Sequence, residues 1–118
     1  MHMKQELAEA LVAPETYKEL DRVHQLFTEL RTTAPVALAS PKGHEPFWFI
    51  SKFADVQAIE SNNDLFHAGD KATVLVDEVT NQLTIEEIGS PHRFLTLVQM
   101  DGEKHKAYRD LTASWFGP

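Results

Sequence analysis

The chain has 118 residues, 42% of them hydrophobic and 25% charged, which suits one domain with its own core. Eleven Lys and Arg against eighteen Asp and Glu give a net charge of −7, which argues against a nucleic-acid backbone or an anionic membrane surface as a partner. The absence of cysteine excludes disulfides, zinc–thiolate sites, thiolate nucleophiles and any cofactor ligand that must be a thiolate.

The sequence carries no signal for a membrane or for secretion. No stretch approaches the roughly 20 apolar residues of a membrane-spanning helix, and the N-terminus lacks a charged segment followed by an apolar one. These features predict a soluble, cytoplasmic protein. Residues 115–118 follow directly on an apolar helical pattern, an ending that suits either a natural domain or a longer protein cut at a helix stop.

The first predicted helix covers residues 16–33 and follows an extended arm at 1–15. Thr16 and Glu19 have the spacing of a capping box, in which each side chain binds a free backbone N–H of the other residue. Apolar residues then recur at spacings of three and four and form one helical stripe. These residues are Leu20, Val23, Leu26, Phe27 and Leu30. Pro35 ends the helix, because the residue before a proline is pushed out of the helical region.

A β-hairpin is predicted over residues 36–50. Its strands are 36–39 and 47–50, and the segment between them, 40–46, is dense in turn-forming residues. A second helix is predicted over 53–62, where helical spacing of apolar residues returns. The order helix, hairpin, helix predicts an α+β fold rather than alternating βαβ units.

Residues 64–100 give no firm prediction. Two short apolar runs, 73–76 and 83–85, could pair as strands or fold into short helices, and both alternatives stay open. A long segment of this kind in a compact domain is usually a functional loop.

The last predicted helix covers 101–116. Asp101 stands at the N-cap position, and Glu103 lies in the first turn, near the positive end of the helix dipole. At 100° per residue the helix has two neighbouring stripes. One holds Tyr108, Leu111 and Trp115, and the other holds His105, Arg109, Thr112 and Phe116. Lys106, Asp110 and Ala113 point away from both stripes, toward water.

His105 and Arg109 are the candidate site residues. Because they are four residues apart, their side chains meet on one helix face. An arginine fork and a histidine ring N–H together suit a carboxylate or phosphate on a ligand. The alternative is an exposed helix face whose donors bind acidic side chains elsewhere, and spacing alone favours that alternative.

Other chemistry has no support in the pattern. The six histidines show no spacing that would present two of them together to a metal ion. The acidic pairs at 77–78 and 86–87 suit a solvated surface, because adjacent residues do not face each other. There is no glycine-rich phosphate loop and no serine-nucleophile motif.

Segment 97–111 resembles a recurring motif of bacterial cytochromes P450. The shared pattern is an apolar residue, then Asp101, two further positions, His105, and Arg109 four residues later, with an apolar end to the helix at Trp115-Phe116. Three upstream segments resemble the same family in the same order. They are 16–36 (helix A into the first sheet), 47–56 (a strand into helix B) and 63–67 (the end of helix B). The resemblance covers residues 11–118, and 64–100 would then be the variable B–C region.

The chain also departs from that pattern. Gly102 and Glu103 stand where prolines are more usual. The oxygen-activation helix, the Glu-x-x-Arg pair and the haem-ligating cysteine loop of the family would lie beyond residue 118. The resemblance therefore implies an α+β N-terminal segment of the cytochrome P450 fold, from helix A to helix C, as an incomplete fold and a single fragment over residues 1–118.

The implied function is the substrate-recognition and haem-propionate-binding portion of a haem-thiolate monooxygenase that hydroxylates a small organic substrate. The 118-residue chain would be inactive alone, because it has no cysteine to ligate haem iron. By position, His105 and Arg109 resemble the pair that binds a haem propionate, and residues 66–98 would line the substrate pocket. In the full-length family a ferredoxin-type or flavoprotein donor supplies electrons.

Two other interpretations stay open. The chain could be a free-standing, haem-independent binding or interaction module with the same fold, or a truncated remnant. For the fragment itself, the stripe of Tyr108, Leu111 and Trp115 and the hairpin would be covered by later parts of the family fold and are left exposed here, which predicts a homo-oligomer.

Overall fold

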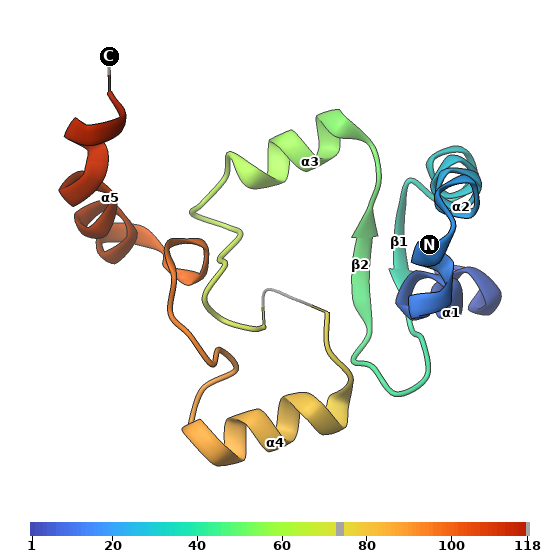
Figure 1. Ribbon diagram of the computed structural model, residues 1–118. Helices are drawn as coiled ribbons and strands as arrows, with labels where there is room; N and C mark the ends of the chain where they lie inside the picture. The colour runs from blue at the N-terminus through green and yellow to red at the C-terminus, as the bar shows by residue number, and fades with distance from the viewer. Residues whose placement is uncertain (73–74, 118) are drawn as a thin grey trace. The chain divides into compact units, whose positions relative to one another are not determined.

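A computed structural model describes residues 1–72 and 75–117. Five α-helices, two short 3₁₀ helices and one two-stranded antiparallel sheet occur in these residues (Figure 1). In chain order the elements are α1 (Gln5–Val12), η1 (Pro14–Lys18), α2 (Leu20–Thr33), β1 (Val36–Ala39), β2 (Phe47–Ile50), α3 (Phe53–Glu60), α4 (Glu78–Ile88), η2 (Leu97–Gln99) and α5 (Gly102–Phe116). The α+β class predicted from the sequence is confirmed.

The chain divides into two compact units, Met1–Ala58 and Ile59–Pro118. The single fragment expected over residues 1–118 stays a prediction. Each unit is described by itself below. Among the described residues, no helix combines the length and the apolar character needed to cross a membrane.

The N-terminal arm is helical where the sequence suggested an extended chain. Leu7 and Leu11 are one helical turn apart in α1, and both are buried together with Ala8. The expectation of an extended arm at 1–15 was therefore wrong. Burial of one apolar stripe, rather than a capping signal, stabilises α1, since its N-cap residue makes no side-chain hydrogen bond.

The capping box predicted at Thr16 was also wrong. Thr16 lies in η1, and α2 begins at Leu20 with Glu19 as its N-cap residue. The Thr16 side chain is buried instead, and its Oγ1 atom has no hydrogen-bond partner. The predicted end of the helix at Thr33 is confirmed, with Ala34 as the C-cap residue.

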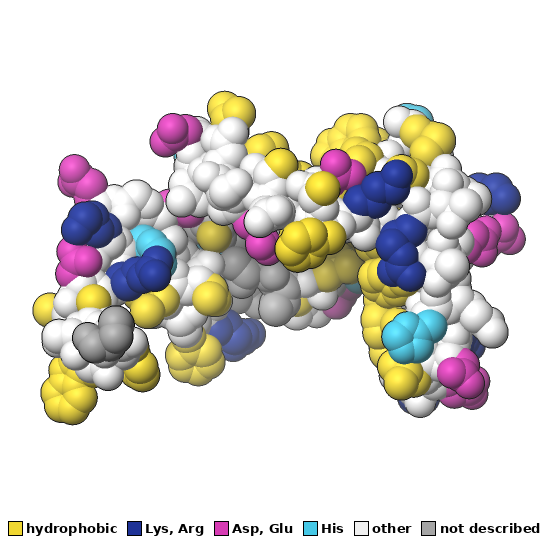
Figure 2. Space-filling model, turned by 90° about the horizontal axis from the view of Figure 1, so that it is seen from above, with side chains coloured by type: hydrophobic (Ala, Val, Ile, Leu, Met, Phe, Trp, Pro, Cys, Tyr) yellow, Lys and Arg dark blue, Asp and Glu magenta, His cyan; other side chains and the backbone are white. Residues whose placement is uncertain are grey.

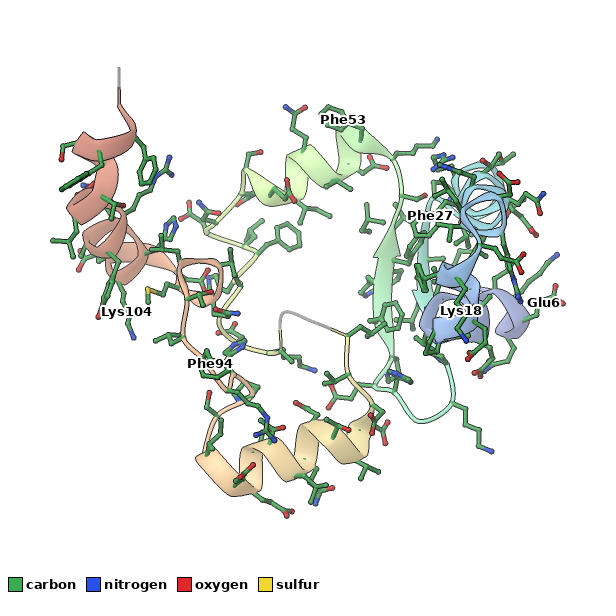
Figure 3. All side chains as sticks on the ribbon, viewed as in Figure 1. Glu6, Lys18, Phe27, Phe53, Phe94 and Lys104 are labelled. Atoms are coloured by element: carbon green, nitrogen blue, oxygen red, sulfur yellow. The ribbon has the colours of Figure 1, made fainter. Side chains whose placement is uncertain are left out.

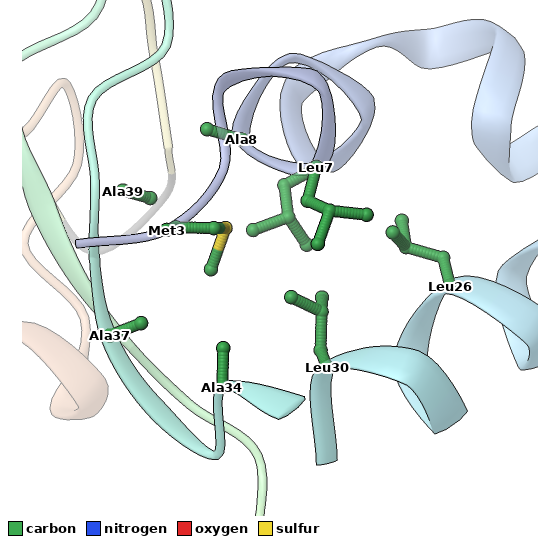
Figure 4. Packing of buried hydrophobic residues seen from close by; sticks show 9 residues of the cluster. Met3, Leu7, Ala8, Leu26, Leu30, Ala34, Ala37 and Ala39 are labelled. Atoms are coloured by element: carbon green, nitrogen blue, oxygen red, sulfur yellow. The ribbon is translucent and has the colours of Figure 1, made fainter. Parts of the chain in front are cut away.

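The core of the first unit lies between α1, α2 and β1 (Figure 4). Leu26 and Leu30 of α2 point toward Leu7 of α1, and Leu30 is fully buried. Leu20 belongs to the predicted stripe but is 69% exposed. The full cluster is Met3, Leu7, Ala8, Leu11, Leu26, Leu30, Ala34, Ala37 and Ala39.

The predicted hairpin is confirmed. β1 and β2 pair antiparallel, with Ala37 opposite Phe49. The Phe49 ring packs edge-on against Phe27 of α2, with ring centroids 5.7 Å apart. The other edge of β1 pairs with the N-terminus: the Met3 N–H donates to the Leu38 carbonyl oxygen (2.9 Å), and the Leu38 N–H donates to the Met1 carbonyl oxygen (3.0 Å).

In the second unit, the open question at 83–85 is answered by a helix. These residues lie within α4. Asp77 caps its N-terminus, because the Asp77 Oδ1 atom accepts a hydrogen bond from the Thr80 N–H (2.9 Å). Gly89 ends it with a left-handed backbone (φ +69°). Of the other run, residues 73 and 74 lie outside the described residues, and 75–76 belong to no helix or strand.

The two remaining predicted helices are present. α3 begins at Phe53 as predicted and ends at Glu60, two residues before the predicted end. The Phe53 ring is exposed, so it takes no part in the apolar side predicted for this helix (Figure 3). α5 follows Asp101 and ends at Phe116, as predicted.

Candidate functional site

The candidate site lies on α5. Asp101 has extended backbone at the N-cap position, but its side chain makes no capping hydrogen bond. Gly102, the first residue of the helix, has a left-handed backbone (φ +57°). Proline is fixed near φ −65° and could not adopt this conformation, so the glycine at this position is a conformational requirement of this chain.

His105 and Arg109 line one pocket of about 500 Å³ along α5. His105 is half-buried and Arg109 is exposed. Within residues 1–72 and 75–117, neither side chain has a hydrogen-bond or ion-pair partner. The pocket therefore holds an arginine fork and a histidine ring N–H that make no hydrogen bond to a side chain of the described structure, although His105 is close enough to Asp101 to favour its ionised form. Its other lining residues are Leu97, Thr112, Ala113, Phe116 and Gly117.

On the other side of α5, unlike at His105 and Arg109, the charged side chains pair with each other. Lys106 and Asp110 form an ion pair with each other across one helical turn, at 2.5 Å. The alternative drawn from the sequence was a helix face whose donors bind acidic side chains. Lys106 fits that description, whereas His105 and Arg109 do not.

Asp101 makes a long-range contact that the sequence did not predict. Its two carboxylate oxygens accept hydrogen bonds from the backbone N–H groups of Ala68 (2.9 Å) and Gly69 (2.6 Å). These two bonds lower the pKa of Asp101, and the nearby His67 and His105 lower it further. A carboxylate at an N-cap position predicts a capping residue. No neighbouring residue in the sequence indicates that this carboxylate binds the backbone N–H groups of Ala68 and Gly69 instead.

A second pocket, of about 320 Å³, lies between α4 and residues 91–99. It falls almost wholly in the 66–98 region that the sequence assigned to substrate contact. Its Asn81 Oδ1 atom is buried without a hydrogen-bond partner. The lining residues are Ala72, Val76, Thr80, Asn81, Thr84, Pro91, His92, Arg93, Phe94, Thr96 and Gln99.

The histidines do not assemble a metal centre in the part of the chain that the structure describes, where no group of three metal-ligating side chains occurs. His67 Nδ1 lies 3.2 Å from an Asp70 carboxylate oxygen, and His92 Nε2 lies 3.2 Å from the Gly69 carbonyl oxygen. The acidic pair at 77–78 is partly explained by capping, since Asp77 caps α4.

The donors on α5 fit the cofactor that the sequence resemblance implied. A haem propionate is a carboxylate, and the pocket at His105 and Arg109 offers donors of both types that bind carboxylates. The iron's thiolate ligand has no counterpart, because the chain contains no cysteine. The residues present thus fit the periphery of a haem and not its axial side.

The known proteins to which this chain is similar are cytochromes P450. No protein-family model matches the chain. Cytochrome P450-terp from a Pseudomonas species is 33% identical over 114 residues, which is 95% of this chain and 26% of that protein. The crystal structure of CYP108D1 from Novosphingobium aromaticivorans superposes with a TM-score of 0.92 at 36% identity, over 99% of this chain and 29% of that one. The chain thus spans little more than a quarter of the length of either relative. In sequence and in fold, the chain corresponds to the N-terminal portion of a cytochrome P450.

Proposed function

We propose that this chain forms the N-terminal, substrate-recognition and haem-propionate-binding portion of a haem-thiolate monooxygenase. The similarity to two cytochromes P450 over nearly the whole chain supports this function. The substrate would be a small organic molecule, and electrons would come from a ferredoxin-type or flavoprotein donor. The thiolate must come from outside these 118 residues, which contain no cysteine.

The observation that carries the proposal is the pair of unused donors on one pocket of α5. Arg109 would bind a haem propionate through two parallel N–H donors of its guanidinium group. His105, one helical turn earlier, would donate its ring N–H to the same carboxylate. Bound haem would supply oxygen activation, whereas this chain's residues would hold the propionate in place.

A role in substrate contact is proposed for the second pocket, between α4 and residues 91–99. It combines apolar side chains such as Phe94 with polar ones such as Asn81. Binding sites for small organic molecules have this mixture, in which apolar contacts give affinity and a few polar groups fix orientation.

The test is a chimera that joins residues 1–118 of this chain to the C-terminal remainder of CYP108D1, the part that follows the matched segment. Haem retention is measured as the haem-to-protein ratio after gel filtration. Arg109→Ala should lower haem affinity by about ten- to a hundredfold, because a hydrogen bond to a charged group is lost. Arg109→Lys should restore it only in part, because an ammonium group cannot make a planar two-point contact.

The matched control is Asp110→Ala, the next residue on α5, whose charge is paired with Lys106 and turned away from the pocket. It should leave haem affinity unchanged. His105→Ala should cost less than Arg109→Ala, because it removes a single ring N–H donor rather than a permanently charged fork of donors. The propionate role is wrong if Arg109→Ala keeps haem as well as Asp110→Ala does.

A further inference from the structure

The contact between Asp101 and residues 68–69 joins two segments far apart in the chain. Ala68 is 33 residues from Asp101 in sequence, and Gly69 is 32. The loop closed by this contact contains α4 and η2. One carboxylate takes both backbone N–H groups, so a single side chain fixes the two ends of the loop against each other.

A side chain at residue 69, on the loop side, would crowd this contact. A Cβ atom at residue 69 would lie 2.9 Å from the Asp101 Oδ2 atom and 3.0 Å from the Gln99 carbonyl oxygen. The first distance is shorter than Cβ atoms show in proteins, and the second is tighter than most. The Gly69 carbonyl oxygen lies 3.2 Å from His92 Nε2, so a third segment of the loop reaches the same point.

The charges around Asp101 favour its ionised form. His67 acts on it from the loop, and His105 acts on it from the next turn of α5. His67 is itself paired with Asp70 at 3.2 Å. His92 Nε2 lies at the Gly69 carbonyl oxygen, and Glu60 lines the same pocket as Asp101 and Ala68.

We propose that Asp101 is a positioning residue: its carboxylate fastens residues 68 and 69 to the start of α5 and thereby holds the first turn of that helix, which carries His105. The hydrogen bonds of Asp101 to residues 68 and 69 support this role directly. An effect of Asp101 on haem binding rests on the proposed function, because Asp101 would act through His105.

The experiment follows the amide proton resonances of Ala68 and Gly69 in the 118-residue chain by NMR. In the unchanged protein both resonances should titrate together, with a midpoint below 3.8, the ordinary value for the Asp101 carboxyl. Because the folded-state pKa is lowered, the contact is complete above that ordinary value and is lost as the pH falls through the folded-state pKa. In Asp101→Asn this titration should vanish.

Hydrogen exchange gives the second readout. Asp101→Asn keeps one acceptor oxygen but turns an amide nitrogen toward a backbone N–H donor. Exchange at residues 68 and 69 should then accelerate by about tenfold, the loss expected for a charge-assisted hydrogen bond. Gly69→Ala should produce the same acceleration from the other side of the contact. Asp101→Glu keeps the carboxylate and should keep an acid titration at these two amides.

Asp110→Asn is the matched control, because it removes a carboxylate from the same helix without touching the contact. It should leave both readouts as in the unchanged protein. The proposal is overturned if the two amides of the unchanged protein do not titrate in acid, or if Asp101→Asn leaves their exchange rates unaltered. The first readout needs no variant, so it decides the matter even if Asp101→Asn fails to fold.

The haem-propionate role of Arg109 and the positioning role of Asp101 can be contradicted independently of each other. Arg109→Ala should not alter the amide titration at residues 68 and 69, since Arg109 makes no contact there. In the CYP108D1 chimera, Asp101→Asn should lower haem retention although Arg109 is intact. Equal haem retention in Asp101→Asn and Asp110→Asn would overturn the positioning of His105, whatever the result for Arg109→Ala.

Discussion

Asp101 shows how one residue type can serve two purposes at the same position. A carboxylate before a helix usually binds the free N–H groups of the first turn, but here both oxygens bind N–H groups of residues 68 and 69. The first turn of α5 has no side-chain cap as a result. The acid sensitivity expected of this contact is therefore a property of the tertiary fold and not of the helix alone.

Local spacing was enough to identify His105 and Arg109 as a pair, because residues four apart on a helix always share a face. It could not identify the partners of Asp101. Those partners are backbone N–H groups, which nearly every residue carries, and they lie more than 30 residues away. The close packing at position 69 was hidden for the same reason, since it comes from atoms of Gln99 and Asp101.

Thr16 carries a stability prediction. Its side chain is 1% exposed and its Oγ1 atom has no partner, so the buried hydroxyl has lost its hydrogen bonds to water without replacement. Thr16→Val removes that hydroxyl and keeps the shape of the side chain. The free energy of unfolding should rise by about 1 kcal/mol.

Urea unfolding of a Trp115→Phe background, followed by the fluorescence of Trp48, reports on the first unit and measures this change. The control is Thr33→Val in α2, which belongs to the same unit. Thr33 is exposed, and its hydroxyl donates to the Glu29 carbonyl oxygen at 2.9 Å. Its removal should not stabilise the protein. A loss of stability in Thr16→Val would show that its hydroxyl is satisfied.

At the scale of elements, the sequence predicted those with strong local signals. α2, the hairpin, α3 and α5 have regular apolar spacing or clear turn residues between them. α1 was missed because a helix of eight residues depends on tertiary packing, which its short pattern does not display. α4 stayed open because its apolar residues do not gather on one buried face: Val79, Leu83, Ile85 and Ile88 are all exposed. Its cap residues, Asp77 and Gly89, were the usable signal.

Two leucines of α2 should differ sharply in their effect on stability. Leu30 is fully buried at the centre of the first unit, whereas Leu20 is 69% exposed. Leu30→Ala should lower the free energy of unfolding by about 2–5 kcal/mol, through lost burial and the cavity left behind. Leu20→Ala should change it by less than about 0.5 kcal/mol.

The same urea experiment with Trp48 fluorescence compares the two variants. Both remove the same atoms from the same helix, so helix propensity cancels between them. Similar losses in the two variants would contradict the core placed between α1, α2 and β1.

At the scale of the whole molecule, exposed apolar side chains predict self-association. Leu111, Trp115 and Phe116 of α5 are each more than 70% exposed, and Figure 2 shows hydrophobic side chains reaching the surface. Patches of this kind on a soluble chain usually mark a contact surface. The 118-residue chain should form a dimer or larger assembly, measured by light scattering across protein concentration.

Trp115→Lys should shift that equilibrium toward the monomer, because it places a charge in the patch. Asp110→Asn changes the net charge by the same amount on the same helix, but at a position that points away from the apolar stripe, and it should not weaken association. A clean monomer of the unchanged chain at high concentration would contradict this prediction.

The lack of cysteine makes a spectroscopic prediction for the chain. The reduced, CO-treated chain should show no strongly red-shifted Soret band, because that band requires a thiolate ligand. Weak haem uptake through a histidine would give a different spectrum and would not conflict with this expectation. A thiolate-type band from these 118 residues would contradict it.

The first three residues have a role that their position at the end of the chain does not suggest. Met1 and Met3 exchange hydrogen bonds with Leu38 and so occupy the side of β1 that β2 leaves open. An unpaired strand edge is a template on which other chains can assemble. A chain that begins at residue 4 would uncover that edge, together with the apolar surface now under Met3, and should form fibrils more readily. An affinity tag is better attached at the C-terminus, where it does not disturb the pairing of residues 1–3 with β1.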